Sequence, residues 1–558
     1  MNATVLPDSD LQQSALPEPA GRLRVVAGVL FILVLASFLR CAGITQTEVW
    51  RDEAITLIHV QATWWELFSV LPRVEDTPPL SFLIFKAWGG LQPSQLLCNE
   101  TWMRLLPVLL GVATVGVLMR TAAFIHPRAW WPVGLLAAVS HVPVHYSQEI
   151  RTYSLLCFAT VLALWTAERA VRAPGQRRWL VLLAVWGALA GHCHAVGVFV
   201  YPVVVAYLLV RVGPGDRQRV WRTWIHGLWL VAVIPVAVFS MHWSRVHGGV
   251  GEWWVPPLDV RGAGGILWRY LGLHPVEHWA LVGEGLGRHW FAFAVENAVM
   301  LLTGGLVALA LLDVRTRGRF AVQAGAAGLF VGFLMLGSEL ALPNLIVRTL
   351  LPAWMLAMLA LGLGGVASPG GRVRWLGPCL VILLVVIHGG MWLAMVRLGD
   401  KRRPASAAGL EWIRAQLQPD DLILTWPTWY EDQVVYHLQD VVRGEQLYTH
   451  FKQVYAGRPA KHQLIHRGPV PETIKRLRDA LSAHRERTGG RYAVYVVRNA
   501  VLWYSDSPLD FHQILSPDHE ETDSYSSPPG GTIHVTRYVP AKMADRSCSA
   551  TSSAPGAP

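Results

Sequence analysis

Two adjacent carboxylates, Asp52 and Glu53, stand in the short polar stretch Glu48–Ala54, just beyond the first hydrophobic segment of the chain. An ionisable side chain near a lipid bilayer is energetically costly, so it is a functional candidate by default. A carboxylate at such a place can take the proton of an attacking hydroxyl, as a general base does. A solvated loop, or the acidic first turn of an interfacial helix, explains the same two residues without chemistry.

Further polar side chains stand near the ends of later hydrophobic segments, and two of them are arginines, which pair bidentately with phosphate. A phosphate that leaves an anomeric carbon departs as an anion. One base and positive charge at the leaving group therefore suffice, whereas a glycosidase needs two carboxylates flanking the sugar. The polar set consists of Asp52, Glu53, Glu75, Asp76, Thr77, His141, His145, Gln148, Glu149, Arg151, Tyr153, His192, His194, Asn344 and Arg348.

Each member of this set also has a structural interpretation. Arg151 and Arg348 could reach from the end of a span to the membrane interface. Asp76 precedes two prolines and could simply form a turn. For His192 and His194 we favour a structural role over a functional one.

The composition indicates a polytopic membrane protein. Of 558 residues, 53% are hydrophobic and only 15% are charged, against about a quarter in a soluble protein. The 26 tryptophans fit rings anchored at the membrane–water interfaces. The six cysteines have neither a CxxC nor a histidine-spaced partner, so we expect neither a disulfide framework nor a zinc site.

Arg22 and Arg24 precede an apolar run that we interpret as a retained signal anchor. Apolar runs predict eleven membrane spans, and residues 1–21 are expected to be disordered. The predicted spans are Val25–Leu39, Leu105–Met119, Ala129–Val144, Tyr153–Thr166, Trp179–Leu189, Val196–Val210, Trp224–Met241, Phe291–Leu312, Phe320–Gly337, Leu345–Gly364 and Trp375–Val396.

The apolar segment Pro79–Leu91 decides the orientation of the chain. If this segment does not cross the membrane, the arginines of alternate loops all fall on one side, as the positive-inside rule requires. We therefore expect residues 44–102 to form one external loop of a transmembrane domain (22–396) in the cytoplasmic (inner) membrane. The candidate site and everything after Arg397 then lie outside the cytoplasm. The same loops account for much of the net charge of +10, so we predict no nucleic-acid partner.

From about Arg397 the composition is that of a soluble domain. Helical periodicity at Ala405–Leu417 and Thr473–Ala483, with strand patterns at Asp421–Thr425, Arg491–Val497 and Thr532–Tyr538, predicts a small extracytoplasmic α/β domain over 397–544. The Ser-, Ala- and Pro-rich tail, 545–558, is expected to be disordered. We find no catalytic constellation in this domain and no P-loop, GxGxxG or HExxH motif in the chain.

Four segments in order, WRDEA, EDTPPL, SQEIRTYSL and PNLIVRTLLP, resemble the GT-C membrane glycosyltransferases of family 39. That family contains the protein O-mannosyltransferases and the lipid A aminoarabinose transferase. The resemblance covers most of residues 25–396 and implies a transferase with a polyprenyl-phosphate-linked sugar as donor and membrane lipids as surroundings. By the same resemblance, Asp52 is the catalytic base with Glu53 beside it, and Arg151 and Arg348 lie near the donor phosphate. Asp76, Glu149 and Tyr153 complete the predicted donor-binding set.

The chain departs from the family pattern at two points. The usual DxHPPL segment reads Asp76-Thr77-Pro78-Pro79-Leu80 here and lacks its histidine, so we assign no metal ligand and leave dependence on a divalent metal open. Thr349 stands where tyrosine is common. The C-terminal domain resembles the tails of bacterial members, which favours undecaprenyl phosphate as the carrier.

Two other functions compete with this prediction. A transporter or lipid flippase would suit a polytopic chain, although we find no internal repeat and the candidate charges stand at span ends. A polymerase or ligase would act on a glycan carried by polyprenyl diphosphate. The sugar stays open, and the acceptor hydroxyl can belong to a lipid, a glycan or a protein.

Overall fold

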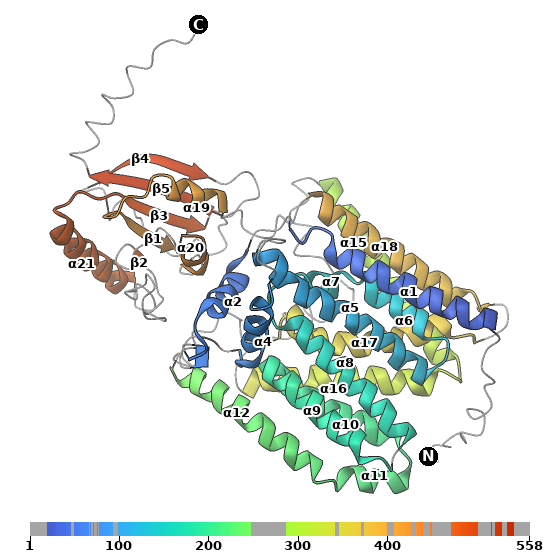
Figure 1. Cartoon of the computed structure of the whole chain (residues 1–558). Coiled ribbons are helices and arrows are strands. Elements are labelled where there is room, and N and C mark those ends of the chain that lie inside the picture. The colour runs from blue at the N-terminus through green and yellow to red at the C-terminus, as the bar shows by residue number, and fades with distance from the viewer. Residues whose placement is uncertain are drawn as a thin grey trace. The chain divides into compact units, whose positions relative to one another are not determined.

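The structure is a computed structural model, and two kinds of architecture are visible in Figure 1, a helical part and a sheet. It describes residues 19–45, 49–65, 67–68, 71, 75, 77–92, 99–173, 175–246, 286–340, 345–369, 373–398, 407–426, 431–438, 447–448, 470–499, 515, 519–526 and 533–540.

The chain divides into two compact units, which we describe separately. The helical unit comprises residues 1–45 and 71–399, and the sheet unit comprises residues 46–70 and 400–558. Residues 46–70, which we expected within the long loop of the membrane domain, therefore belong to the sheet unit.

The helical unit is built from helices of very different lengths. The helices are α1 (Pro19–Cys41), α4 (Leu80–Gly89), α5 (Asn99–Ile125), α6 (Trp130–Val139), α7 (His141–Tyr146), α8 (Tyr153–Arg172), α9 (Arg177–Cys193), η2 (Ala195–Phe199), α10 (Val200–Arg211), α11 (Pro214–Trp221), α12 (Ile225–Val246), α15 (Leu286–Leu312), α16 (Arg317–Leu340), η4 (Val347–Leu350), α17 (Leu351–Val366) and α18 (Leu376–Leu398).

Six of the described helices are long and apolar enough to cross a membrane, or seven if α11 and α12, bent by 42°, form one span. Four more apolar stretches of 10–17 residues lie in α4, in α6, in η2 with α10, and in the part of α15 from Asn297 to Leu312. At about 1.5 Å per residue, α4 and α6 are shorter than a hydrocarbon layer of about 30 Å. The expected span Ala129–Val144 shows one cause, because Ser140 (φ −54°, ψ 120°) divides it into α6 and α7. The chain is thus a multi-pass membrane protein with six or seven long apolar helices described.

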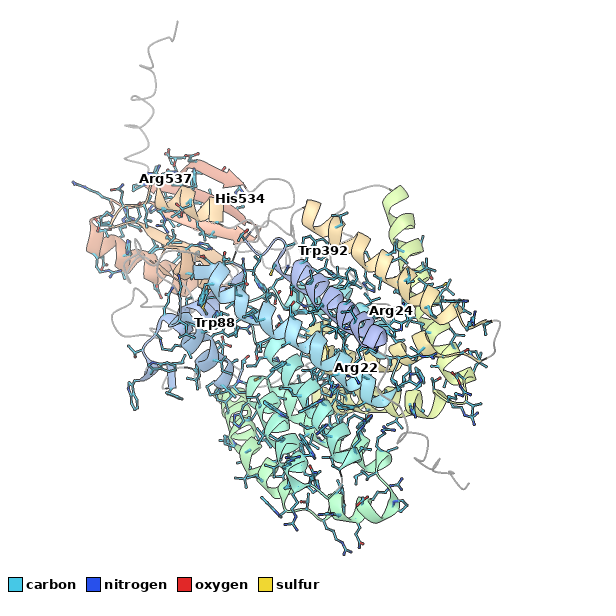
Figure 2. All side chains as sticks on the ribbon, turned by 45° about the vertical axis from the view of Figure 1, so that its right-hand side comes forward. Arg22, Arg24, Trp88, Trp392, His534 and Arg537 are labelled. Atoms are coloured by element: carbon cyan, nitrogen blue, oxygen red, sulfur yellow. The ribbon has the colours of Figure 1, made fainter. Side chains whose placement is uncertain are left out.

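The two ends of α1 have different surroundings. Its first turns carry the exposed Arg22 and Arg24, and Trp392 of α18 lies near its other end (Figure 2). The Trp392 indole N–H donates to the Leu39 carbonyl at 3.1 Å. Trp392 thereby satisfies one of the carbonyls that a helix leaves unpaired in its last turn.

Small residues allow the late helices to pack closely. A Cβ atom on Gly364 of α17 would lie 2.2 Å from the Leu306 carbonyl oxygen of α15, and one on Gly377 of α18 would lie 2.6 Å from the Gly364 carbonyl oxygen. Only glycine permits backbones to approach in this way, as is common between helices in membranes.

The sheet unit contains a five-stranded mixed sheet with strand order β2-β1-β3-β5-β4. β1 pairs in parallel with β2 and β3, whereas β5 pairs antiparallel with β3 and β4. The polar β4 was not predicted, because its sequence HEETDSYS lacks an apolar alternation. The elements of this unit are α2 (Arg51–Gln61), α19 (Ala407–Arg414), β1 (Leu422–Trp426), α20 (Glu431–Leu438), β2 (Leu447–Tyr448), α21 (Val470–Thr488), β3 (Val494–Asn499), β4 (His519–Ser526) and β5 (Ile533–Pro540).

Candidate active site

Asp52 and Glu53 occupy the first turn of α2, in the sheet unit. Glu53 is fully buried, and its carboxylate accepts the backbone N–H of Trp50, the N-cap residue, at 3.5 Å. This contact resembles half of a capping box and gives Glu53 a structural role at the start of the helix. Asp52 is 9% exposed and its carbonyl accepts the Thr56 hydroxyl at 3.1 Å. The structure thus gives the Glu53 carboxylate a capping role, whereas the bond described for Asp52 is made by its backbone.

In the helical unit, the segment 147–154 (SQEIRTYS) leads from α7 into the first residues of α8, and hydrogen bonds from Gln148, Thr152 and Ser154 hold it to other helices. The Gln148 side-chain amide donates to the carbonyls of Leu39, Arg40 and Ala42 at 3.3, 3.1 and 2.9 Å, at the end of α1. The Thr152 hydroxyl donates to the Cys193 carbonyl, at the end of α9, at 2.6 Å.

Ser154 completes these anchors, since its hydroxyl donates to the Tyr146 carbonyl of α7 at 3.2 Å. Segment 147–154 is thereby bound through side chains to the ends of three different helices. The odd-numbered residues Glu149, Arg151 and Tyr153, which we predicted as donor-binding, are carried by this anchored segment.

These three odd-numbered residues are all buried. Glu149 accepts from the His145 Nε2 at 2.9 Å, a pairing within one helical turn of spacing. Tyr153 begins α8 and is 2% exposed, and Arg151 is 8% exposed. A buried guanidinium and a buried carboxylate in one short segment are costly unless both have polar partners.

Arg348 reaches the same place from a distant part of the chain. It lies in η4, and its guanidinium carbon is 5.7 Å from the centroid of the Tyr153 ring, a cation–π distance. The following Thr349 caps this turn, because its hydroxyl accepts the Ile346 N–H at 3.2 Å and donates to the Ile346 carbonyl at 2.8 Å. Threonine at this position therefore fixes the turn that carries Arg348.

His194, which we expected to be structural, joins the same group. Its ring centroid is 5.8 Å from that of Tyr153, and its Nδ1 accepts the Val196 N–H at 3.3 Å. Burial, together with the positive charges of Arg348 and then Arg151, lowers the pKa of His194 to about 3. The ring is consequently neutral at physiological pH, and because Nδ1 is an acceptor, the proton is on Nε2. The sequence feature that points to His194 is its position directly after a hydrophobic segment.

Arg40 is also buried, although we did not predict it as a site residue. Its hydrogen bonds give it a structural role. Its two terminal nitrogens donate to the carbonyls of Ala138 and Ala137 at 3.0 and 3.1 Å, near the end of α6. The break of the helix at Ser140 leaves these carbonyls without helical partners, and Arg40 supplies donors. Arg40 also lines a cavity with Tyr146, Tyr153 and Cys157, beside the group described above.

Asp76 lies outside the described residues, although its neighbours Glu75 and Thr77 are buried. Among the residues that the structure describes, no group of three His, Cys, Asp or Glu side chains could hold a metal ion. The helical unit thus brings together Glu149, Arg151, Tyr153, His194 and Arg348, while Asp52 and Glu53 belong to the sheet unit.

Comparisons with known proteins agree with the fold. Residues 76–243 match the family model described as dolichyl-phosphate-mannose-protein mannosyltransferase. The crystal structure of ArnT from Cupriavidus metallidurans bound to undecaprenyl phosphate is similar with a TM-score of 0.53 and 12% identity, over 93% of this chain and 98% of that one. The resemblance to GT-C membrane glycosyltransferases is confirmed.

Two further GT-C structures are similar at lower scores. They are the arabinofuranosyltransferase AftD from Mycobacteria (TM-score 0.49, 15% identity, 93% of this chain and 40% of that one) and the oligosaccharyltransferase of Archaeoglobus fulgidus (0.47, 12%, 90% and 72%). No curated protein matches the chain. We take only the fold from the structural likeness to ArnT. Together, the family match and this fold indicate a glycosyltransferase.

Proposed function

We propose that this protein transfers a sugar from a polyprenyl-phosphate donor to a hydroxyl acceptor, by inverting displacement at the outer face of the cytoplasmic membrane. The observation that carries the proposal is the group of Arg151, Tyr153, His194 and Arg348 in the helical unit. Two guanidinium groups and a neutral imidazole N–H can donate hydrogen bonds to the oxygens of a phosphate diester, and arginine suits phosphate particularly well.

In the proposed reaction the acceptor oxygen attacks the anomeric carbon while the bond from that carbon to the phosphate oxygen breaks. The acceptor proton passes to the Asp52 carboxylate, and the polyprenyl phosphate leaves as an anion. Arg151 and Arg348 stabilise the charge that develops on the leaving phosphate, the point at which fixed cations lower a barrier most. Glu53 keeps its helix-capping role and supports Asp52.

The remaining predicted residues receive supporting roles. Glu149 orients His145, and Tyr153 holds Arg348 on its ring face. The His194 Nε2–H donates to the donor phosphate or to the sugar, and Asp76 binds the donor.

The proposed orientation follows from the loop arginines. It includes eleven spans and an extracytoplasmic sheet domain, as the positive-inside rule favours. The carrier named for ArnT, undecaprenyl phosphate, and the dolichyl phosphate in the family description are both polyprenyl monophosphates. Both support a monophosphate carrier for this chain.

The test is transfer of a radiolabelled sugar by the purified full-length protein in membranes of defined lipid. Donors with a polyprenyl monophosphate and with a diphosphate carrier are compared, each with lipid, glycan and protein acceptors. Label in an acceptor from the monophosphate donor alone supports the proposal. Transfer only from the diphosphate indicates a polymerase or ligase, and movement of labelled lipid across the membrane without transfer indicates a flippase.

A further inference from the structure

At the end of α8 opposite Tyr153, arginines of α5 and α8 lie within cation–π distance of one aromatic ring, that of Phe124 in α5. The guanidinium carbons of Arg120, Arg169 and Arg172 lie 4.9, 5.8 and 4.4 Å from the centroid of the Phe124 ring. α8 has 20 residues, so this end is about 30 Å from the candidate active site.

A second ring continues the cluster at the start of α9. The guanidinium carbons of Arg169 and Arg178 lie 4.7 and 4.8 Å from the Trp179 ring centroid. Gln176 accepts from both the Arg178 Nε and the Trp179 indole at 3.0 Å, which fixes their positions. We call the group of Arg120, Phe124, Arg169, Arg172, Arg178 and Trp179 the arginine patch.

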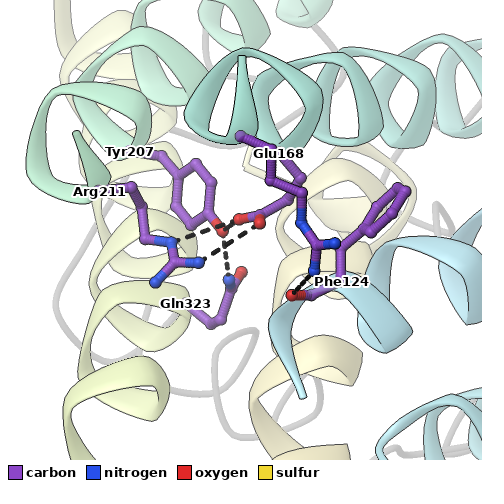
Figure 3. Close-up of polar contacts among 6 residues, drawn as sticks. Phe124, Glu168, Tyr207, Arg211 and Gln323 are labelled. Atoms are coloured by element: carbon purple, nitrogen blue, oxygen red, sulfur yellow. Dashed lines mark hydrogen bonds and ion pairs between the residues drawn. The ribbon is translucent and has the colours of Figure 1, made fainter. Parts of the chain in front are cut away.

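The nearby carboxylate, Glu168, attracts Arg172 electrostatically, but its hydrogen bonds go to side chains outside the patch. Glu168 is 1% exposed and accepts from Arg211 through Nε and Nη2, both at 3.3 Å, and from the Tyr207 hydroxyl (Figure 3). Gln323 donates to the same hydroxyl at 2.8 Å and closes this buried network. Within the described parts of the chain, no carboxylate forms an ion pair with the four arginines of the patch.

Positive charge dominates this end of the helical unit. Arg120, Arg172 and Arg178 are exposed. Arg172 donates to the Phe124 carbonyl through one terminal nitrogen at 2.8 Å, and its side chain is exposed. In the adjoining turn, burial and the charges of Arg319 and Arg128 lower the pKa of His126. A site of this kind attracts an anion.

We propose that the arginine patch binds the phosphate headgroup of an anionic phospholipid in the leaflet at this end of α8. Guanidinium planes held on aromatic rings are already ordered, so they lose little conformational freedom when their N–H edges bind phosphate. Trp179 is buried and Phe124 is half-buried, so both rings support the guanidinium groups from the protein side and leave the exposed arginines to meet a headgroup. The patch is separate from the proposed donor site and does not depend on the proposed reaction.

The competing explanation is a general preference of basic loops for an anionic leaflet, to which any loop arginine contributes. Arg315 and Arg317, exposed in the turn before α16 and at its start, provide the matched control, because their removal changes the net charge equally. The full-length protein is placed in nanodiscs of phosphatidylcholine, alone or mixed with phosphatidylglycerol. Thermal unfolding and retained lipid, by native mass spectrometry, are measured for each variant.

We expect phosphatidylglycerol to raise Tm and to be retained by the wild-type protein. Affinity should fall by roughly ten-fold for each arginine removed in Arg169→Gln/Arg172→Gln, because each loses charge-assisted hydrogen bonds to the phosphate. It should fall much less in Arg315→Gln/Arg317→Gln, which lose only the general attraction to an anionic surface. Arg169→Lys/Arg172→Lys, which keeps the charge, should be intermediate. If the Gln double variant does not fold, selective retention of phosphatidylglycerol by the wild type and its weakening in the Lys variant decide the question.

Equal losses in the patch and control variants would overturn the proposal in favour of a general charge effect. Inorganic phosphate at matched ionic strength that raises Tm as much as the lipid does would also overturn it, since it would indicate a free anion as the ligand. Retention of phosphatidylcholine and phosphatidylglycerol in equal amounts by the wild type would likewise contradict a site that is selective for anionic headgroups.

Discussion

Arg151 and Arg348 are far apart in the sequence, yet both of their charges act on His194, and Arg348 lies over Tyr153. A charge-assisted hydrogen bond to phosphate contributes about 1.5–3 kcal/mol. Arg151→Ala should therefore raise the donor KM and lower kcat, with a combined loss in kcat/KM of roughly ten- to a hundred-fold. Arg151→Lys should recover only part of this loss, because lysine lacks the planar fork.

Arg128→Ala, at an exposed position in the turn after α5, is the control and should keep wild-type kinetics. Unchanged kinetics in Arg151→Ala would instead assign Arg151 to membrane anchoring. Steady-state transfer assays with varied donor distinguish the two outcomes.

His194 provides a prediction about pH. A pKa of about 3 means that the ring gains a proton only in strong acid, so its charge does not change between about pH 5 and 8. We expect His194→Gln, which keeps an N–H donor, to retain much of the activity and the same pH–rate profile, whereas His194→Phe should bind donor more weakly. Loss of an acidic limb of the profile in His194→Gln would show that His194 titrates during the reaction.

At the scale of elements, segment 147–154 depends on Gln148, whose amide binds three carbonyls at the end of α1. Gln148→Leu keeps the size of the side chain but loses these bonds, so Arg151 should lose its fixed position. We expect a several-fold rise in donor KM together with faster hydrogen exchange in 147–154. Gln176→Leu, which removes an exposed glutamine, should change neither quantity. Faster exchange with unchanged kinetics would limit Gln148 to a stabilising role.

The periodicity of the sequence predicted which helices and strands exist better than it predicted how long they are. Strand patterns placed β1, β3 and β5 within a few residues, because short apolar runs such as Leu422–Leu424 and Val494–Val497 are buried there. β4 was missed because its residues are polar, and its pairing with β5 is decided by tertiary contacts. The span expected at Ala129–Val144 is divided because Ser140 leaves helical geometry, and hydropathy carries no information on such a break.

Residues of the candidate site that belong to a sequence motif could be predicted, whereas residues that join the site only through tertiary packing could not. Segment SQEIRTYS and Arg348 were identified from residue types and from the resemblance. The contribution of His194 was missed because it depends on the Val196 N–H and on two arginines that are distant in sequence. The capping contact of Glu53 agrees with the acidic first turn of a helix, which we considered as the explanation without chemistry.

At the scale of the whole molecule, the proposed orientation has a direct consequence. The loop arginines fall on one side only if Pro79–Leu91 does not span, and the helix found there, α4, has ten residues. A reporter that is active only outside the cytoplasm, fused after Ala405, should therefore give a signal. A reporter active only in the cytoplasm, fused at the same residue, should stay silent, and the opposite pattern would invert the proposed topology.

The central claim is that Asp52 takes the proton of the acceptor during sugar transfer, and kcat measurements on full-length Asp52→Asn and Glu53→Gln at saturating donor test it most directly. Removal of a general base costs about two to four orders of magnitude in kcat. We predict this loss for Asp52→Asn with donor binding nearly intact, and a smaller loss for Glu53→Gln. More than about a tenth of wild-type turnover in Asp52→Asn, with an inactive Glu53→Gln, would contradict the claim.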